Sequence, residues 1–374
     1  MAELLKEKIY IFGQQNFPAI PKPTYNAEQL DVTNRLILEE LRYNKCSLSK
    51  DHEELMNKLI EEQRSIYDRI ITTVKRNKGG FFFLYGHGAI GKTFIWRTLS
   101  STIRSKGDIV LTVASRGIAS LLLPGGRIAH SRFAIPLNVT EDLTCYIKQG
   151  SPLASLIVKT KLIIWDEAPM IHRYCFEVLD KTLRDILRFE DISNLDRPFG
   201  GKTIVLGRDF RQILPVITKG NRQDIVNAAL NSSYLWADCH LLKLTKNMRL
   251  EGNHESDLND RIEFADWILA VGDGMIGNSV DGIGKVPILD DILISDCKDP
   301  ISAIVNSTYP DFYSHCSDVT YLQKRAILDP TLDMVESINE HTVSLNQSEG
   351  TTFFSSDTMS FRRDIYRFGT STYS

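Results

Sequence analysis

The sequence has little that could build a metal centre or a disulfide framework, because its few cysteines stand far apart. None of them belongs to a C-x-x-C pair; they are Cys46, Cys145, Cys175, Cys239, Cys297 and Cys316. This spacing argues against zinc modules and small secreted disulfide scaffolds, and it fits a reducing compartment.

The sequence also lacks a long apolar run and an excess of basic residues. No stretch approaches the ~18 apolar residues that a membrane-spanning helix needs, and residues 1–12 (MAELLKEKIYIF) do not resemble a secretory signal. We therefore expect no membrane partner. The net charge is −3, so any nucleic-acid contact must be a local groove rather than a globally basic surface.

What the chain does contain is a phosphate-loop motif. Residues 81–93 read FFFLYGHGAIGKT, and from Gly86 onward they satisfy the pattern G-x-x-x-x-G-K-[ST]. In such a loop the backbone N–H groups around Gly86, Gly88 and Gly91 wrap phosphate oxygens. Lys92 reaches the terminal phosphates and the Thr93 hydroxyl lies on Mg²⁺. The motif predicts binding of a nucleoside triphosphate, and its alternative is a surface glycine loop.

The surrounding pattern predicts an α/β fold with a parallel sheet. Apolar strand candidates alternate with helical stretches; they are residues 81–85, 108–114, 161–166 and 203–209. Strands that are buried on both faces and separated by helices indicate right-handed crossovers. One apolar stripe of helical spacing runs through 51–76, and a second predicted helix covers 93–106.

Changes in composition along the chain predict five segments. They are an N-terminal arm (1–50), a nucleotide-binding lobe (51–250), a glycine-rich link (251–290), the beginning of a second α/β lobe (291–345) and a polar, frayed tail (346–374). We expect the second α/β unit to begin with the apolar stretch 288–294 and to contain a strand at 321–329 (YLQKRAILD).

Polar residues at strand ends supply the expected hydrolytic chemistry. Asp166 and Glu167 follow an apolar strand, where Asp166 would hold Mg²⁺ and Glu167 would polarise the attacking water. Gln212 follows the next strand and could contact the γ-phosphate or its water. Arg249 could stabilise charge on the leaving phosphate. Taken alone, these residues would be a solvated turn, a polar loop and a surface arginine.

Two further features concern the base and the nucleic acid. Gln63 could read adenine through its amide; its alternative is a helix-surface glutamine. In the segment 113–137, Arg127, His130 and Ser131 place hydrogen-bond donors beside the Phe133 ring. Donors for phosphates and a ring for base stacking are typical of single-strand binding. The alternative for this segment is a loop with one core phenylalanine.

Together these segments resemble the Pif-one family of superfamily-one-B DNA helicases, especially the branch associated with plant Helitron-type transposons. The resemblance is close to continuous from about residue 30 to 345, and its runs include FFFLYGHGAIGKTF, ASRGIASLLLPGGRIAHSRFAIPL, LIIWDEAPM, FGGKTIVLGRDFRQILPV, LTKNMRL and FADWILAVGDG. It implies two RecA-like lobes that clamp ATP and Mg²⁺, and a motor moving five-prime to three-prime on single-stranded DNA.

The resemblance also implies residue roles. It assigns adenine to Gln63, phosphate and metal to Lys92 and Thr93, and γ-phosphate sensing to Gln212 and Arg249. It assigns metal binding to Asp166 and activation of the attacking water to Glu167. It also assigns DNA contact to the region of His130 and Ser131. A nuclear location, a monomeric state and roles in DNA repair, recombination and telomere maintenance are expectations of the same kind.

The chain departs from the family pattern at several positions. Ala89-Ile90 replace Gly-Thr or Gly-Gly-Thr, Ile128 replaces a Thr, Arg208 replaces the second Gly of a Gly-Gly-Asp run, and Asp329 replaces an Ala. A glycine at position 208 can adopt φ > 0, so Arg208 is expected to be strained there. The later family motifs are absent, which predicts a complete first lobe and a partial second lobe, and indicates either a truncated product or a partial gene model.

Three functions remain open at this point. The first is a helicase-family ATPase that acts on DNA. The second is a binding-only remnant that holds ATP and single-stranded DNA without unwinding. The third, a phosphate-loop kinase or GTPase, is disfavoured because the sequence lacks an Asn-Lys-x-Asp guanine reader.

Overall fold

The computed structural model describes residues 34–88, 90–209, 211, 213–248, 250, 258–277, 285–294 and 298–345. The chain divides into two compact units, residues 1–276 and 277–374. The boundary falls within the segment 251–290 that the sequence analysis treats as a link. The other predicted bounds remain predictions, and most of the N-terminal arm and the whole tail lie outside the described residues.

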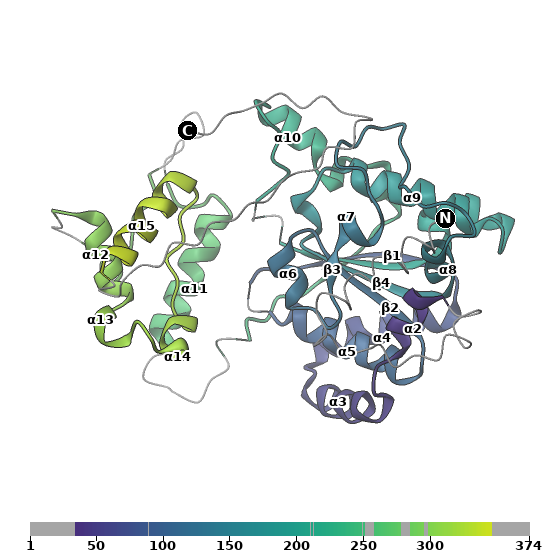
Figure 1. Ribbon diagram of the computed structural model, residues 1–374, viewed down its shortest axis with the longest axis horizontal. Helices are drawn as coiled ribbons and strands as arrows, with labels where there is room; N and C mark the ends of the chain where they lie inside the picture. Colours follow the sequence, from purple (N-terminus) through teal and green to yellow (C-terminus); the bar gives the residue numbers. More distant parts are fainter. Residues whose placement is uncertain are drawn as a thin grey trace, which may run out of the picture. The chain divides into compact units, whose positions relative to one another are not determined.

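Within the described part of the first unit, six parallel strands form one sheet (Figure 1), in the order β3-β2-β4-β5-β1-β6. The strands are β1 (Gly80–Tyr85), β2 (Ile109–Ala114), β3 (Arg127–Ile128), β4 (Thr160–Asp166), β5 (Thr203–Arg208) and β6 (His240–Lys243). This arrangement confirms the predicted α/β fold with a parallel sheet. Because all the strands run the same way, their carboxyl ends meet at one edge.

Helices cover both faces of this sheet. The described α-helices of the first unit are α2 (Arg35–Leu41), α3 (Lys45–Lys58), α4 (Glu61–Arg76), α5 (Lys92–Ser105), α6 (Gly117–Leu121), α7 (Ala129–Arg132), α8 (Pro152–Lys159), α9 (Tyr174–Leu187), α10 (Arg222–Ala228) and α11 (Leu258–Gly272). Short 3₁₀ turns are η2 (Ala168–Met170), η3 (Ile192–Leu195), η4 (Pro198–Gly201), η5 (Leu230–Ser232) and η6 (Tyr234–Asp238).

Alternate residues of the central strands enter two separate hydrophobic cores. Phe83 and Trp165 pack with α8 and α9 on one face. Leu84 and Ile164 pack with α4 and α5 on the other. Each strand therefore reads as a continuous apolar run, which is why the strands could be predicted from sequence.

The predicted helical stripe over 51–76 is two helices rather than one. The chain is extended at Leu59 and Ile60, between α3 and α4. Leu59 packs in the same core as Ile66 and Ile70 of α4, so the apolar spacing continues through the break. Within the predicted N-terminal arm, residues 34–50 contain α2 and the beginning of α3. The side chains of Asn34 and Asn44 cap the N-terminal ends of these two helices.

The second unit is helical where it is described. Its helices are α12 (Pro300–Thr308), α13 (Phe312–His315), α14 (Val319–Gln323) and α15 (Leu332–Ser344), and α12 packs against α15. The strand predicted at 321–329 is wrong, because this segment begins inside α14. The apolar stretch at 288–294 is turn and coil. The Asp318 side chain accepts hydrogen bonds from the amides of Thr320 and Tyr321, and this N-cap outweighs the apolar run that follows.

None of the helices in the described ranges is long and apolar enough to cross a bilayer.

Candidate active site

The phosphate loop lies between the end of β1 and the start of α5, as the sequence predicts. Gly91 is the N-cap of α5 and has φ 83°, a left-handed conformation that glycine adopts without strain. The amides of Phe94 and Ile95 donate to the Gly91 carbonyl at 3.1 and 3.2 Å, so the helix begins directly at the loop. The first N–H groups of a helix have no partner within it, which makes this end suited to phosphate.

The Lys92 ammonium lies over the loop. Its Nζ donates to the backbone carbonyl oxygen of Gly86 and to that of His87, the latter at 2.9 Å. Burial lowers the pKa of Lys92, while the nearby carboxylates of Asp166 and Asp209 favour its charged form. The side chain that the motif assigns to the terminal phosphates therefore lies beside the acidic end of the sheet.

Gln63 is almost completely buried, with 1% of its surface exposed, and both of its amide atoms bond within the protein. Its Oε1 accepts from the Ile60 amide at 3.4 Å at the start of α4, and its Nε2 donates to the Ile90 carbonyl at 3.3 Å. A Cβ on Gly91 would lie 2.4 Å from this Nε2. Gln63 thus fastens α4 to the phosphate loop, and its adenine role remains a prediction.

The acidic pair lies at the carboxyl end of β4, next to β5 in the sheet. Asp166 pairs with Gly207 of β5, and the absence of a side chain at Gly207 leaves room for the Trp96 ring, which lies 2.3 Å from the position a Cβ would take. Burial raises the pKa of Asp166 to about 6, and the Lys92 and Arg208 charges oppose the rise. Glu167 has φ 60° and ψ 30°, uncommon for a residue with a side chain and often found at functional sites.

Arg208, the last residue of β5, points its guanidinium into this acidic end and lies against the Glu167 side chain. The residue is 5% exposed. Burial lowers the pKa of Arg208 to about 10, so it is charged at neutral pH. The strain expected at this position is absent, because Arg208 belongs to the extended strand and has no positive φ. Its contact with Glu167 is a feature that the sequence analysis missed.

The residues at this edge fit a magnesium ion. No cluster of three or more His, Cys, Asp or Glu side chains suited to a metal occurs in the described ranges. Mg²⁺ does not require one, since it commonly takes one or two protein oxygens and completes its shell with water and phosphate. Asp166 and Thr93 supply such oxygens, and a buried carboxylate with a raised pKa is one whose charge a cation would stabilise.

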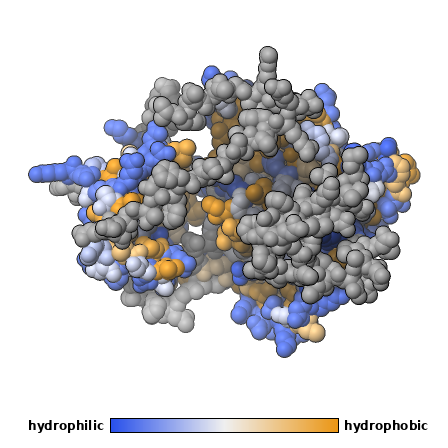
Figure 2. All heavy atoms as spheres, viewed as in Figure 1, coloured by the Kyte–Doolittle hydropathy of each residue, from blue (hydrophilic) through white to orange (hydrophobic). Residues whose placement is uncertain are grey.

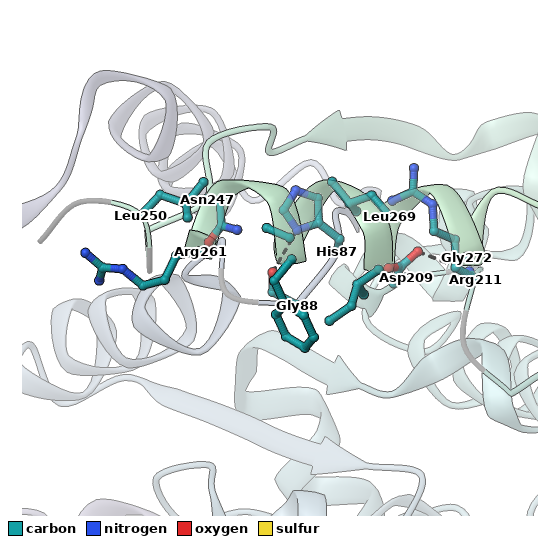
Figure 3. Close-up of a pocket in the computed structure, with 12 residues that line it drawn as sticks. His87, Gly88, Asp209, Arg211, Asn247, Leu250, Arg261, Leu269 and Gly272 are labelled. Carbon is teal, nitrogen blue, oxygen red and sulfur yellow. Dashed lines mark hydrogen bonds between the residues drawn. The ribbon is translucent and has the colours of Figure 1, made fainter. Parts of the chain in front are cut away.

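A pocket of about 520 Å³ adjoins the phosphate loop. Figure 3 shows the residues that line it, which come from the loop, from the segments after β5 and β6, and from α11; they are His87, Gly88, Asp209, Arg211, Asn247, Leu250, Arg261, Phe264, Ala265, Ile268, Leu269 and Gly272. Arg211 forms two bonds to Asp273, of 2.5 and 3.1 Å, which fasten the end of α11 beside the site. The pocket has the size of a small-molecule site.

Two of the predicted site residues, Gln212 and Arg249, lie outside the described residues, and so does Ala89 of the phosphate loop. Their roles remain predictions.

The predicted DNA-binding residues do not lie on one surface. Arg127 and Ser131 are exposed, and Arg127 Nη2 lies 3.3 Å from Glu39 Oε2. His130 is half-buried, with its Nε2 3.7 Å from the Cys175 sulfur. Phe133 is fully buried, and its ring centroid lies 6.0 Å from that of Trp165. The prediction that a base stacks on Phe133 is wrong, because the ring fills the core beneath α7.

The large hydrophobic side chains that this segment exposes are aliphatic rather than aromatic. Ile118, Leu121 and Leu122 are 82%, 83% and 63% exposed at α6. Figure 2 shows hydrophobic side chains gathered over this helix. Such side chains offer bases van der Waals contact without ring stacking, so a strand held here would depend more on its phosphates.

Residues 58–282, more than half of the chain, match the family described as PIF1-like helicase. Named relatives include the ATP-dependent DNA helicase RRM3 of Saccharomyces cerevisiae, 27% identical over 53% of this chain and 27% of that protein. Another is the ATP-dependent DNA helicase PIF1 of Emericella nidulans, 30% identical over 39% of this chain and 20% of that protein. The chain thus matches about a quarter of the length of these relatives.

The chain is also similar to parts of solved Pif1 helicase structures. The crystal structure of a Bacteroides Pif1 helicase with ADP-AlF3 and single-stranded DNA is 24% identical, with a TM-score of 0.46. The match covers 58% of this chain and 47% of that one. A Candida albicans Pif1 helicase is 22% identical, with a TM-score of 0.43, over 60% of this chain and 45% of that one.

Proposed function

The chain belongs to the PIF1-like helicase family, and we propose that it hydrolyses ATP and couples hydrolysis to five-prime-to-three-prime movement on single-stranded DNA. The observation that carries this proposal is the joining of two motifs at one edge of the sheet. The phosphate loop with Lys92 ends β1, and the acidic pair Asp166–Glu167 ends β4 two strands away. That arrangement supports phosphate binding and water activation at neighbouring positions.

The residues at this edge would divide the work as follows. The loop amides and the N-terminus of α5 hold the β- and γ-phosphates, and Lys92 adds a positive charge. Thr93 and Asp166 would hold Mg²⁺, which neutralises charge developing on the phosphate oxygens. Glu167 orients a water toward the γ-phosphorus and accepts its proton as the bond to ADP breaks. Gln212 and Arg249 would sense the γ-phosphate.

For the nucleic acid, we propose that single-stranded DNA contacts the surface around Arg127 and Ser131, close to the exposed α6. A nuclear location and roles in DNA repair, recombination and telomere maintenance extend this proposal by analogy with the family. We also propose that the chain acts as a monomer.

The experiment is steady-state ATP hydrolysis by the 374-residue chain with and without single-stranded DNA. We expect hydrolysis that DNA stimulates, and Glu167→Gln should abolish turnover while nucleotide still binds, because Lys92 and Asp166 remain. Normal hydrolysis by Glu167→Gln would refute the role of that carboxylate.

The same assay tests a second candidate, a protein that holds ATP and DNA without turnover. The buried guanidinium of Arg208 favours it, because this large side chain lies against the carboxylate that must activate water. Binding of both ligands with no hydrolysis under any DNA condition would support this alternative over the motor.

A further inference from the structure

A cavity of about 310 Å³ in the first unit is lined by residues of α3 and α5, two helices that pack against each other. Its apolar side is formed by α3 and by two residues outside the helices; these side chains are Tyr43, Leu48, Leu55 and Pro124. Its polar side is one stripe of α5 at helical spacing, made of Arg97, Ser100, Ser101 and Arg104. A cavity with one apolar and one polar side, of this size, suits a small organic molecule.

Two polar groups of this stripe are buried and have no hydrogen-bond partner in the part of the chain that the structure describes. They are Ser100 Oγ and Arg104 Nε, one helical turn apart, on residues that are 1% and 3% exposed. Arg104 uses its other two nitrogens, which donate to the carbonyls of Pro124 and Val110 at 2.8 and 3.0 Å. The guanidinium is therefore held in place. Its remaining donor and the Ser100 hydroxyl are costly to bury unless a molecule in the cavity bonds to them.

The buried charges around Arg104 do not balance. Arg104 and Arg132 are both buried and share one buried carboxylate, that of Glu40. Glu40 pairs with Arg132 through Oε1, and its Oε2 lies 3.8 Å from Arg104 Nη2, too far for a hydrogen bond. The other charged side chains that line the cavity are exposed and equal in number of each sign; they are Asp51, Glu54, Lys58 and Arg97. The interior therefore carries an excess positive charge that an anion would compensate.

We propose that this cavity binds a small organic anion, a carboxylate or a phosphate monoester. Its charged head accepts hydrogen bonds from Ser100 Oγ and Arg104 Nε, and its apolar body lies against the α3 side chains. None of the phosphate-loop residues 86–93 lines this cavity, so the site is separate from the nucleotide site and does not depend on the proposed hydrolysis. Leu48 and Leu55 precede residue 58, where the family match begins, so membership of the family does not account for the site.

The first test titrates the full chain with two probes of nearly equal shape, para-fluorobenzoate and the neutral para-fluorobenzamide, and follows binding by fluorine NMR. We expect the benzoate to bind about tenfold more tightly, because only its head is an anion that the arginine and the hydroxyl can bind together. para-Fluorophenyl phosphate tests the phosphate class, and the tighter of the two anionic probes identifies the class of ligand. No binding by either anionic probe, or equal affinities for benzoate and benzamide, would overturn the proposal.

Neighbouring serines of α5 supply matched variants. The Ser101 hydroxyl already donates to the Thr98 carbonyl at 3.0 Å, whereas the Ser100 hydroxyl has no partner within the described ranges. Ser100→Ala should melt at or above the wild-type temperature, because it loses no hydrogen bond, and should bind para-fluorobenzoate about fivefold more weakly. Ser101→Ala should bind the probe as wild type does. Equal affinities for the two variants would show that the Ser100 hydroxyl does not contact the ligand, and would overturn the assignment.

A competition experiment separates this cavity from the nucleotide site. ADP with Mg²⁺ is added to the full chain with para-fluorobenzoate bound. We expect the probe to stay bound, because no phosphate-loop residue lines the cavity. Displacement of the probe by ADP would place it at the phosphate loop and overturn the proposal.

Discussion

At the scale of the residue, we propose that Lys92 carries much of the phosphate recognition. Lys92→Ala removes a partly buried ammonium that donates to the loop carbonyls of Gly86 and His87, and water cannot supply its charge. We expect nucleotide affinity to fall by about 2–3 kcal/mol, measured by titration with a fluorescent nucleotide. Lys106→Ala, at the exposed far end of α5, is the control and should bind normally. Equal affinities for the two variants would refute the phosphate-loop assignment.

The buried charge of Asp166 lowers the folding stability of the nucleotide-free chain. Burial raises its pKa from 3.8 to about 6, so the folded state holds the proton more tightly than the unfolded state. Below pH 3.8 both states are neutral and there is no penalty. The penalty grows as pH rises toward 6 and is constant above it.

Asp166→Asn removes that charge. We expect the nucleotide-free variant to be more stable than wild type by about 1–3 kcal/mol near neutral pH, with the gain shrinking toward pH 4. Urea unfolding at a series of pH values measures it. A gain that is larger at pH 4 than at neutral pH would contradict this account, and the variant should not hydrolyse ATP.

At the scale of the element, the strand–loop–helix unit of β1 and α5 could be predicted because a local motif and a buried strand agree. The break between α3 and α4 could not, because Leu59 continues the apolar spacing across it. The contact between Arg208 and Glu167 depends on β4 and β5 being neighbours in the sheet, which no local pattern encodes. At α14, Asp318 is a typical helix N-cap residue and could have predicted a helix start, but the apolar run that follows favoured a strand.

Phe133 tests the assignment of the segment around α7. Its ring is fully buried against Trp165, so Phe133→Ala should cost about 3–5 kcal/mol in the free energy of unfolding. At a temperature where the variant remains folded, its affinity for single-stranded DNA should match wild type. Ser131→Ala, on the exposed side, is the comparison and should leave stability unchanged. Weaker DNA binding by Phe133→Ala at full stability would restore the stacking interpretation.

At the scale of the whole molecule, the net charge of −3 means that DNA must bind against an overall repulsion. Binding should therefore weaken steeply with salt, with a log–log slope of about −0.7 for each phosphate neutralised. Arg127→Ala should reduce the magnitude of that slope by roughly one such increment, because Arg127 is exposed at the proposed surface. Fluorescence anisotropy of a labelled strand at several salt concentrations measures both. An association that does not depend on salt would argue against phosphate contacts.

Two indole rings stand on opposite faces of the sheet beside the site. Trp96 of α5 lies in one core and Trp165, next to Asp166 on β4, lies in the other, and both are fully buried. The protein therefore carries its own optical reporter on each side of the reaction centre. We expect nucleotide to change the intrinsic emission of the chain, and Trp165→Phe and Trp96→Phe to separate the contribution of each face. Emission unchanged by saturating nucleotide would mean that both indole environments are insensitive to the ligand.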